Sequence, residues 1–538
     1  MRSALEHVFA SVRRRNALAG VNVQSFGIVP SIIAAEKVVH VTGNVKQKAI
    51  SATLWSIARI GFDQFFSFIV FVVIARLLGP VEVGIFALGM IVSELARIFA
   101  TSGFADAVTK AEAAHEEQVA RAAFWGNMAL SVVCAIVMML LAEPIGWMMQ
   151  TDRLAGVLMA LAWTIPLSAG SAIHMARRLR QFGHKTLAIR AFLSGSIGGA
   201  IAIAAAYMGY GVWALVIQRF VTETITMVTA WLAYRWWPSF NFSRADMTSI
   251  LPFSLKMSFS KLFGVIVSRI QDIVIGIFTG PGPVGVYRIG RRTIDMMMTA
   301  TLTPLSTVAV NFFVAVRDDK LRFQQSFLKL VTVSSCITFP AFFGLAAAAD
   351  VLVPIVYGHK WDAAIPILQL LTPLCIPLVI SLYTLPVLTV FGEAGKAARM
   401  TMIQFFLSLA LALAAAPFGV EAIVIALLIR TYVMIPYQLR LIEQHTDCSL
   451  ARVVKRIIRP LAASMIMATS CYVTLLYWPK DILSDFVVLA LVVLEGALIY
   501  ALVLAIIDRQ SIRWLLEILT TILRRKSNRN ISAASAAE

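Results

Sequence analysis

Long apolar stretches alternate with short polar segments along almost the whole chain of 538 residues. A helix needs about 20 mainly apolar residues to cross a bilayer. Fourteen stretches meet this length, so the pattern predicts an all-α polytopic membrane protein. The predicted transmembrane helices lie near residues 51–77, 84–108, 122–142, 154–175, 187–208, 211–234, 250–279, 284–313, 326–349, 364–391, 399–416, 419–440, 460–478 and 485–507.

A glycine–proline motif occurs twice at the same place in this pattern. The segment Gly79–Gly89 returns as Gly280–Gly290, 201 positions later, with five identical residues. In both copies a long apolar stretch precedes the motif and another follows it. Proline and glycine favour a tight reversal between two helices, so the motif by itself has a structural explanation. Its repetition predicts two related halves, an architecture common among solute carriers.

Each half contains six predicted helices, which is an even number. Both copies therefore enter the membrane in the same direction, and we expect them to be related by an axis along the membrane normal. The predicted organisation is, in chain order, a basic cytoplasmic arm at 1–48, a six-helix bundle at 49–240, a second six-helix bundle at 241–445, two additional helices at 446–508 and a basic cytoplasmic tail at 509–538.

Lysine and arginine are concentrated in every second polar segment. Cytoplasmic loops carry an excess of these residues, so the alternation supports the helix assignment and places both termini in the cytoplasm. The basic residues of the predicted cytoplasmic segments include Arg13, Arg14, Arg15, Lys46, Lys48, Arg177, Arg178, Arg180, Lys185, Arg317, Lys320, Arg322, Arg452, Lys455, Arg456, Arg459, Arg524, Arg525, Lys526 and Arg529.

Composition agrees with a membrane protein. Hydrophobic residues make up 59% of the chain and charged residues 14%, against about 45–50% and about 25% in soluble domains. The net charge of +18 does not require nucleic acid, because anionic lipid head groups attract basic loops. The five cysteines lack CxxC spacing and the seven histidines are scattered, so we expect no metal or other cofactor.

Two isolated residue types have simple explanations. Tryptophans near predicted helix ends, such as Trp361, are expected to anchor the protein at the membrane interface. His174 lies in the apolar fourth helix, where it is either a hydrogen-bonded interior residue or a proton carrier.

Ionisable residues inside the predicted helices are the main candidates for function. A charge at the bilayer centre costs at least about 2.5–3.5 kcal/mol, so such residues are usually paired or functional. Most acids and bases here are three or four positions apart, on one helical face. The alternative explanation is a set of internal salt bridges that only hold helices together. The charged residues are Arg59 and Asp63, Glu94 and Arg97, Arg219 and Glu223, Arg269 and Asp272, and Arg288, Arg291, Arg292 and Asp295.

We interpret these residues as the lining of an aqueous, net cationic cavity. The repeat supports this, because Glu94 and Asp295 occupy equivalent positions of the second helix of each half. Guanidinium groups bind phosphate oxygens in bidentate fashion, so the arginine excess suits a phosphate-bearing substrate. The predicted substrate-binding arginines are Arg59, Arg97, Arg219, Arg269, Arg288 and Arg291. The predicted ion-coupling or salt-bridge carboxylates are Asp63, Glu94, Glu223, Asp272 and Asp295.

At the level of motifs, the chain resembles bacterial polysaccharide-export flippases of the multidrug/oligosaccharidyl-lipid/polysaccharide exporter superfamily. The resemblance covers roughly residues 45–445 and rests on the order of several short segments. These segments are Gly79-Pro80-x-x-Val83-Gly84-Ile85-Phe86, Arg177-Arg178-Leu179-Arg180-Gln181-Phe182, Arg269-x-x-Asp272 before Gly280-Pro281-x-x-Val284-Gly285-Val286-Tyr287, and Tyr357-Gly358-His359-Lys360-Trp361. The arm at 1–48 departs from the short N-terminus usual in that family.

The resemblance implies a V-shaped pair of six-helix bundles that works by alternating access. Its substrate would be an oligosaccharide linked to undecaprenyl pyrophosphate, carried across the bacterial inner membrane. The arginines would meet the pyrophosphate, and the carboxylates would couple transport to protons or sodium. Polysaccharide polymerase and export proteins are the protein partners that the resemblance suggests.

Two other functions remain open from the residues alone. A multidrug or toxin extruder of the same superfamily would bind organic cations, which favours a cavity with excess acid rather than excess arginine. A membrane polysaccharide polymerase or ligase would need a large external loop, and no predicted loop provides one. The sequence leaves the sugar composition, the coupling ion, the oligomeric state and the role of the last two helices undetermined.

Overall fold

The computed structural model describes residues 64–112, 115–180, 184–241, 243–446, 448–478, 484–510 and Trp514. This part of the chain is almost entirely α-helical and contains no strand. The predicted arm at 1–48, the start of the first helix, Arg59, Asp63 and most of the tail lie outside the described residues.

The first described helix spans Gln64–Leu77. The remaining helices are α3 Pro80–Lys110, α4 Glu116–Leu140, α5 Ala142–Met148, α6 Arg153–Ala162, α7 Thr164–Arg180, α8 His184–Tyr207, α9 Val212–Ala233, α10 Arg244–Thr279, α11 Pro281–Thr301, α12 Thr303–Ala315, α13 Lys320–Ala347, α14 Ala349–Tyr357, α15 Ala364–Leu371, α16 Cys375–Val390, α17 Ala394–Ala415, α18 Val420–Thr446, α19 Leu450–Tyr477 and α20 Asp485–Ile507. Short 3₁₀ turns, η2 to η4, occupy His359–Trp361, Thr372–Leu374 and Ala416–Phe418.

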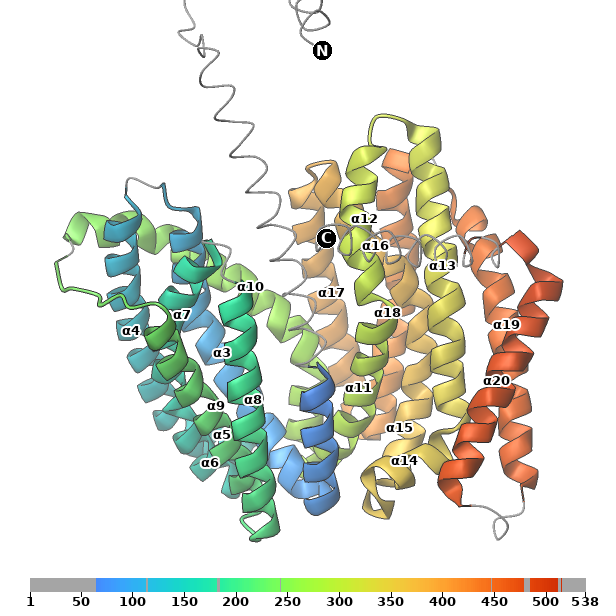
Figure 1. Ribbon diagram of the computed structural model, residues 1–538, viewed down its shortest axis with the longest axis horizontal. Coiled ribbons are helices and arrows are strands. Elements are labelled where there is room, and N and C mark those ends of the chain that lie inside the picture. The colour runs from blue at the N-terminus through green and yellow to red at the C-terminus, as the bar shows by residue number, and fades with distance from the viewer. Residues whose placement is uncertain are drawn as a thin grey trace, which may run out of the picture. The chain divides into compact units, whose positions relative to one another are not determined.

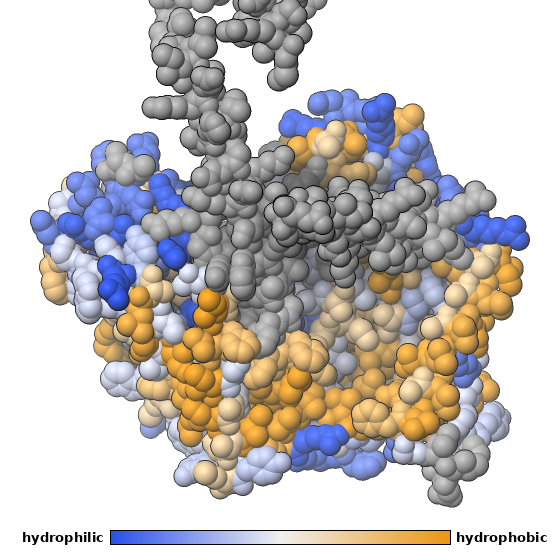
Figure 2. Space-filling view, in the orientation of Figure 1, coloured by the Kyte–Doolittle hydropathy of each residue, from blue (hydrophilic) through white to orange (hydrophobic). Residues whose placement is uncertain are grey.

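Eleven segments of the described chain are long and apolar enough to cross a membrane, against the fourteen predicted. The predicted helices that do not qualify correspond to Gln64–Leu77, α9 and α11. The first is short in its described part, and the other two carry ionised side chains. Figure 2 shows apolar side chains over α8 and α20, where Phe192 and Leu498 are exposed. These exposed apolar faces are expected where helices meet lipid rather than water.

Three predicted helices are interrupted in the structure. The helix predicted at 154–175 is divided into α6 and α7 at Trp163, and the one at 284–313 into α11 and α12 at Leu302. The helix predicted at 364–391 contains the η3 turn at Pro373. Proline lacks the N–H that a helix interior requires, so breaks of this kind follow from Pro304 and Pro373.

The helices form two bundles joined through α10. We call Gln64–Leu77 and α3–α9 the first bundle, and α10–α18 the second bundle. Helix α10 packs along α3 from Ser254 to Gly276, and it also contacts α4 of the first bundle and α11, α17 and α18 of the second. Figure 1 shows α10 crossing from one bundle to the other. The additional helices α19 and α20 pack on each other, and α19 packs along α13.

The two copies of the glycine–proline motif pack directly against each other. Each copy starts a helix, with Gly79 before α3 and Gly280 before α11. A Cβ atom added at Gly84 would overlap the carbonyl oxygen of Pro281, and one added at Gly285 would overlap that of Pro80. Glycine is therefore required at both positions, and the reciprocal contact is what a two-fold relation between the repeats produces.

Further contacts join the bundles at this same end, which we call the Gly–Pro end. Arg76 donates hydrogen bonds to the carbonyl oxygens of Ile355 and Val356. Trp361 is fully buried and donates from Nε1 to the carbonyl oxygen of Ala75 at 2.8 Å. The expectation that Trp361 anchors the protein at the interface was therefore wrong, because its indole fills a contact between bundles.

A matching contact runs in the opposite direction. Gln150 of the first bundle donates from Nε2 to the carbonyl oxygen of Ile277 in α10 at 2.9 Å. Ile277 lies 202 positions after Ala75, whose carbonyl oxygen accepts from Trp361, so the two acceptors match within one position of the repeat offset of 201. Each bundle thus supplies a short loop that hydrogen-bonds the end of the helix preceding the other motif.

Candidate functional site

Two adjoining cavities of about 690 Å³ and about 510 Å³ lie beside the helix Gln64–Leu77. They share eight lining residues, so we treat them as one space and call it the central cavity. The shared residues are Ser67, Val70, Phe86, Met90, Arg97, Gln218, Arg219 and Arg292. Helices of both bundles contribute, since α3 and α9 belong to the first bundle and α11 to the second.

Arginine dominates the charge of the central cavity. Six arginines and three carboxylates line it, which leaves an excess of three positive charges. The arginines are Arg97, Arg190, Arg219, Arg269, Arg288 and Arg292, and the carboxylates are Glu94, Glu223 and Asp295. The predicted residues Arg97, Arg219, Arg269, Arg288, Glu94, Glu223 and Asp295 are thus brought together, whereas their roles stay a prediction.

Arg269 connects the two bundles within this cavity. Its Nη2 atom lies 3.1 Å from Glu94 Oε2 of α3, and its Nη1 atom lies 4.0 Å from Asp272 Oδ2 of α10. Arg288 Nε of α11 lies 3.4 Å from the other oxygen of Asp272. The Asp272 side chain is only 3% exposed and does not line the cavity. Asp272 is therefore a buried support that orients two cavity arginines.

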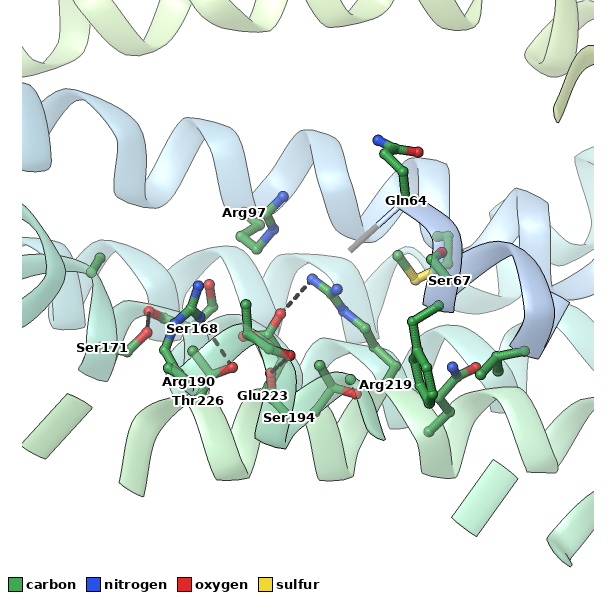
Figure 3. Close-up of a pocket in the computed structure, with 18 of the residues that line it drawn as sticks. Gln64, Ser67, Arg97, Ser168, Ser171, Arg190, Ser194, Arg219, Glu223 and Thr226 are labelled. Atoms are coloured by element: carbon green, nitrogen blue, oxygen red, sulfur yellow. Dashed lines mark hydrogen bonds and ion pairs between the residues drawn. The ribbon is translucent and has the colours of Figure 1, made fainter. Parts of the chain in front are cut away.

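The first bundle holds a second ion pair and an arginine without a carboxylate. Arg219 Nη2 lies 2.5 Å from Glu223 Oε1, as the four-residue spacing predicted. Arg97 makes no ion pair with any described acid, and its Nε atom is buried without a hydrogen-bond partner there. Figure 3 shows Arg97 near the Arg219–Glu223 pair with no dashed line from it. The Arg97 guanidinium is therefore available to an anionic ligand.

The expected pairing of Glu94 with Arg97 was wrong. The spacing of three residues allows it, but Glu94 points to Arg269 of α10 instead. A contact between helices decided this partner, and the sequence of α3 alone carries no information about it.

The prediction that Arg291 lines the same cavity as the other arginines was also wrong. This residue does not line the central cavity but a separate space inside the second bundle. Neighbouring positions of a helix are about 100° apart around its axis, so Arg291 and Arg292 cannot share one direction. Arg291 still pairs with Asp295, at 2.9 Å between Nε and Oδ1, and Asp295 does line the central cavity.

Two arginines of the cavity were not among the predicted site residues. Arg292 donates from Nη2 to Ser67 Oγ at 2.8 Å, which links the second bundle to Gln64–Leu77. Arg190 of α8 donates from Nη1 to Thr226 Oγ1 at 3.3 Å. The signal for Arg190 was present, because it is a charged residue within the apolar stretch predicted at 187–208.

Hydroxyl groups surround the arginines on the first-bundle side. Ser171 donates to the carbonyl oxygen of Ser168 at 2.9 Å, and Ser194 donates to that of Ala191 at 3.3 Å. Both hydroxyls line the cavity, and their oxygens keep lone pairs that accept hydrogen bonds. This wall therefore suits a ligand that carries many hydroxyl donors.

His174 and the possible metal ligands were the other residues considered in the sequence. His174 is buried, with Nε2 lying 3.0 Å from the carbonyl oxygen of Trp236, so it is a hydrogen-bonded interior residue. Within the described ranges, no group of three or more His, Cys, Asp or Glu side chains is arranged to hold a metal ion. The polar groups that line the central cavity are guanidinium, carboxylate, amide and hydroxyl groups.

Comparisons with known proteins identify the family of this chain. A family profile described as polysaccharide biosynthesis protein matches residues 73–366, more than half of the chain. The succinoglycan biosynthesis transport protein ExoT of Rhizobium meliloti (strain 1021) is 25% identical over 332 residues, which are 61% of this chain and 67% of that protein.

The fold also matches solved structures. One is the lipid II flippase MurJ in an inward closed conformation, with a TM-score of 0.70 and 14% identity over 86% of this chain and 100% of that chain. Another is an inward-facing multidrug resistance MATE family transporter of the MOP superfamily, with a TM-score of 0.54 and 16% identity over 73% of this chain and 99% of that chain. These two likenesses establish the fold, which is common to flippases and drug transporters.

Proposed function

Because the chain belongs to the polysaccharide biosynthesis protein family and has a multi-pass transporter fold, we propose that it flips a lipid-linked oligosaccharide diphosphate across the membrane. The chain is a membrane transporter rather than an enzyme. The proposed substrate is an oligosaccharide repeat unit on undecaprenyl pyrophosphate, and the proposed mechanism is alternating access of the central cavity.

The excess of three positive charges in the central cavity is the observation that carries this proposal. Arginine binds phosphate oxygens in bidentate fashion, and a diphosphate supplies charge for several arginines at once. Arg97 is the first candidate for this contact, because it has no carboxylate partner in the described chain. The hydroxyl wall of Ser171 and Ser194 suits the sugars.

The carboxylates offer a route for coupling. Glu94 and Glu223 form ion pairs with Arg269 and Arg219 in the central cavity. A diphosphate that binds these arginines competes with both acids. Uptake of a proton or a sodium ion then lowers the free energy of the displaced carboxylates, since a desolvated unpaired charge is costly. Substrate and coupling ion would thus enter the cavity together.

Multidrug extrusion is the alternative that the shared fold permits. An organic cation would meet the net positive cavity as a like charge, which costs free energy in a partly desolvated site. The charge of the lining therefore favours the anionic substrate. The family assignment to polysaccharide biosynthesis points the same way.

Cellular placement follows from the proposed substrate. We expect the protein in the bacterial inner membrane with both termini in the cytoplasm, where lipid-linked repeat units are assembled. Polysaccharide polymerase and export proteins would then act on the flipped product. The arm at 1–48 and the pair α19 and α20 have no part assigned in this proposal.

Polysaccharide output in a producing strain whose chromosomal copy has been deleted tests the proposal. Arg97→Gln and Arg292→Gln should each lower output at least about tenfold, because a hydrogen bond to a charged group contributes about 1.5–3 kcal/mol. Immunoblots of the membrane fraction measure protein abundance in parallel. The matched control is Arg153→Gln, whose partner Glu82 lies outside the cavity and whose side chain is 60% exposed.

Three outcomes separate the candidate functions. Loss of output at normal abundance, with Arg153→Gln active, supports a diphosphate substrate. Normal output from both cavity variants contradicts it. Resistance to organic cations conferred by the wild-type protein, without any effect on polysaccharide, would favour drug extrusion instead.

A further inference from the structure

A smaller cavity of about 200 Å³ lies inside the second bundle, separate from the central cavity. It is formed by α11, η3, α16, α17 and α18, and its polar lining includes Arg291, Arg430 and Gln438. None of these residues lines the central cavity. The space is therefore a second site that the transport proposal does not use.

The repeat relates this cavity to the first-bundle side of the central cavity. Gly211 precedes α9 and Gly419 precedes α18, both with positive φ values of 55° and 90°. Their residue numbers differ by 208. With this offset, four cavity residues of α9 correspond to four residues that line the smaller cavity. The pairs are Arg219 with Leu427, Thr222 with Arg430, Glu223 with Thr431, and Thr226 with Met434.

The offset of 201 between α3 and α11 adds two more pairs, Met90 with Arg291 and Arg97 with Met298. Six positions on two helices thus line a cavity in each bundle. The smaller cavity is therefore the repeat-related counterpart of a ligand-binding space rather than an accidental packing defect.

The charges of the two spaces have been rearranged between the repeats. The carboxylate of Glu223 is replaced by the hydroxyl of Thr431, and the neighbouring Thr222 is replaced by Arg430. Arg430 makes no hydrogen bond or ion pair with any other described residue, and its Nε atom is buried. The second bundle therefore keeps a cation and lacks the acid that would balance it.

The other charged group facing this cavity does not compensate Arg430. Arg291 is also a cation, and its own partner is Asp295, at 2.9 Å. Even when Asp295, which lines the central cavity, is counted here as the partner of Arg291, the two arginines leave one net positive charge around the space. A partly desolvated charge without a partner costs free energy, so a negative ligand beside Arg430 would stabilise the site.

We propose that this cavity binds a small monovalent inorganic anion of the size of chloride. One negative charge neutralises the excess, whereas sulfate or phosphate would replace it by a buried negative charge. Ser381 donates to Gln438 Oε1 at 2.7 Å, so the Nε2 donor of Gln438 is left for the anion. Apolar walls such as Leu378 and Leu427 also disfavour strongly hydrated anions.

Occupancy of the site would reach the central cavity through α11. Arg291 lines the smaller cavity, while its partner Asp295 lines the central one. An anion beside Arg291 competes with Asp295 for the guanidinium. The proposed anion site does not depend on which substrate the central cavity carries.

Thermal unfolding of the purified full chain in detergent tests the site. The unfolding temperature is measured in potassium chloride, bromide, sulfate and gluconate at equal ionic strength. Binding to the native state alone raises the transition temperature. We expect chloride and bromide to raise it by about 2 °C or more relative to gluconate, and sulfate to give no comparable rise.

Three variants assign the effect to the cavity. Arg430→Gln should abolish the chloride-dependent rise, whereas the control Arg440→Gln on the exposed side of the same helix should keep it. Gln438→Glu introduces a carboxylate of nearly the same shape, which replaces the anion. That variant should lose the chloride dependence without a lower transition temperature in gluconate.

Each outcome decides the proposal. A chloride-specific rise that is lost in Arg430→Gln and Gln438→Glu but kept in Arg440→Gln supports it. The absence of any chloride-specific rise in the wild type overturns it, as does a full rise in Arg430→Gln. If Arg430→Gln does not fold, a full chloride-dependent rise in Gln438→Glu overturns the proposal by itself.

Discussion

At the scale of single residues, burial separates a structural carboxylate from those that line the central cavity. Asp272 lies beneath Arg269 and Arg288 and is almost completely buried, whereas Glu94 and Asp295 line the cavity. All three were grouped together by their spacing in the sequence. Their different environments assign Asp272 to the support of the arginines.

We predict that Asp272→Asn destabilises the protein more than a substitution in an exposed ion pair. Removing one partner of a buried pair leaves the other charge uncompensated and costs about 3–5 kcal/mol. The control is Asp362→Asn, because Asp362 is half-exposed and pairs with His359, an arrangement that contributes about 0–1 kcal/mol. Thermal unfolding in detergent measures both, and equal transition temperatures for the two variants would contradict the assignment.

At the scale of helices, the glycine–proline motif determines how closely α3 and α11 approach. The motif was explained from the sequence as a reversal between helices, and the structure confirms that the chain turns there. Its second role, as the contact between the repeats, rests on Gly84 and Gly285. Neither role requires a ligand.

We predict that Gly84→Ala and Gly285→Ala weaken this crossing, because each new methyl group overlaps a proline carbonyl of the other copy. Overpacking of this kind costs about 1–3 kcal/mol. Gly282→Ala is the matched control, since its Cβ would lie 3.7 Å from Val81 Cγ2 in ordinary contact. Unfolding temperatures and membrane abundance report the difference. A Gly282→Ala variant as unstable as the other two would refute the close-contact explanation.

At the scale of the whole described unit, the bundles are joined at the Gly–Pro end by contacts made in both directions. The hydrogen bonds of Arg76 and Trp361 join Gln64–Leu77 to the second bundle. The hydrogen bond of Gln150 joins the first bundle to α10. An alternating-access cycle must break these contacts to open the cavity at that end. These contacts are therefore expected to determine the relative populations of the states that are closed and open at the Gly–Pro end.

We predict that Trp361→Phe combined with Arg76→Gln shifts this balance towards the state that is open at the Gly–Pro end. Each lost hydrogen bond contributes about 0.5–1.5 kcal/mol, so the open population should rise several-fold. A cysteine introduced at Met90, which lines the central cavity, reports the change through its reaction with a membrane-impermeant thiol reagent added from that side.

The same Met90→Cys background with Arg153→Gln provides the control, because the Arg153–Glu82 pair lies within the first bundle. A labelling rate that is unchanged by the double substitution would show that these hydrogen bonds do not hold the bundles closed.

Much of the architecture was accessible from the sequence, for a physical reason. A helix needs about 20 mainly apolar residues to cross the lipid bilayer, and these residues are consecutive in the sequence. The repeat was visible because glycine and proline are hard to replace where helices reverse and cross. The breaks at Trp163 and Leu302 were missed, since a broken helix and a continuous one can have the same apolar composition.

The sequence by itself determined that the chain crosses the membrane many times, repeats one motif in two halves and carries arginines inside its apolar helices. Only the tertiary structure decided which of these arginines face one cavity. Arg292 enters it and Arg291 does not, although they are adjacent in the sequence. A side chain's direction depends on the rotation and packing of its helix against partners far along the chain. Arg269, for example, meets Glu94 from 175 positions away.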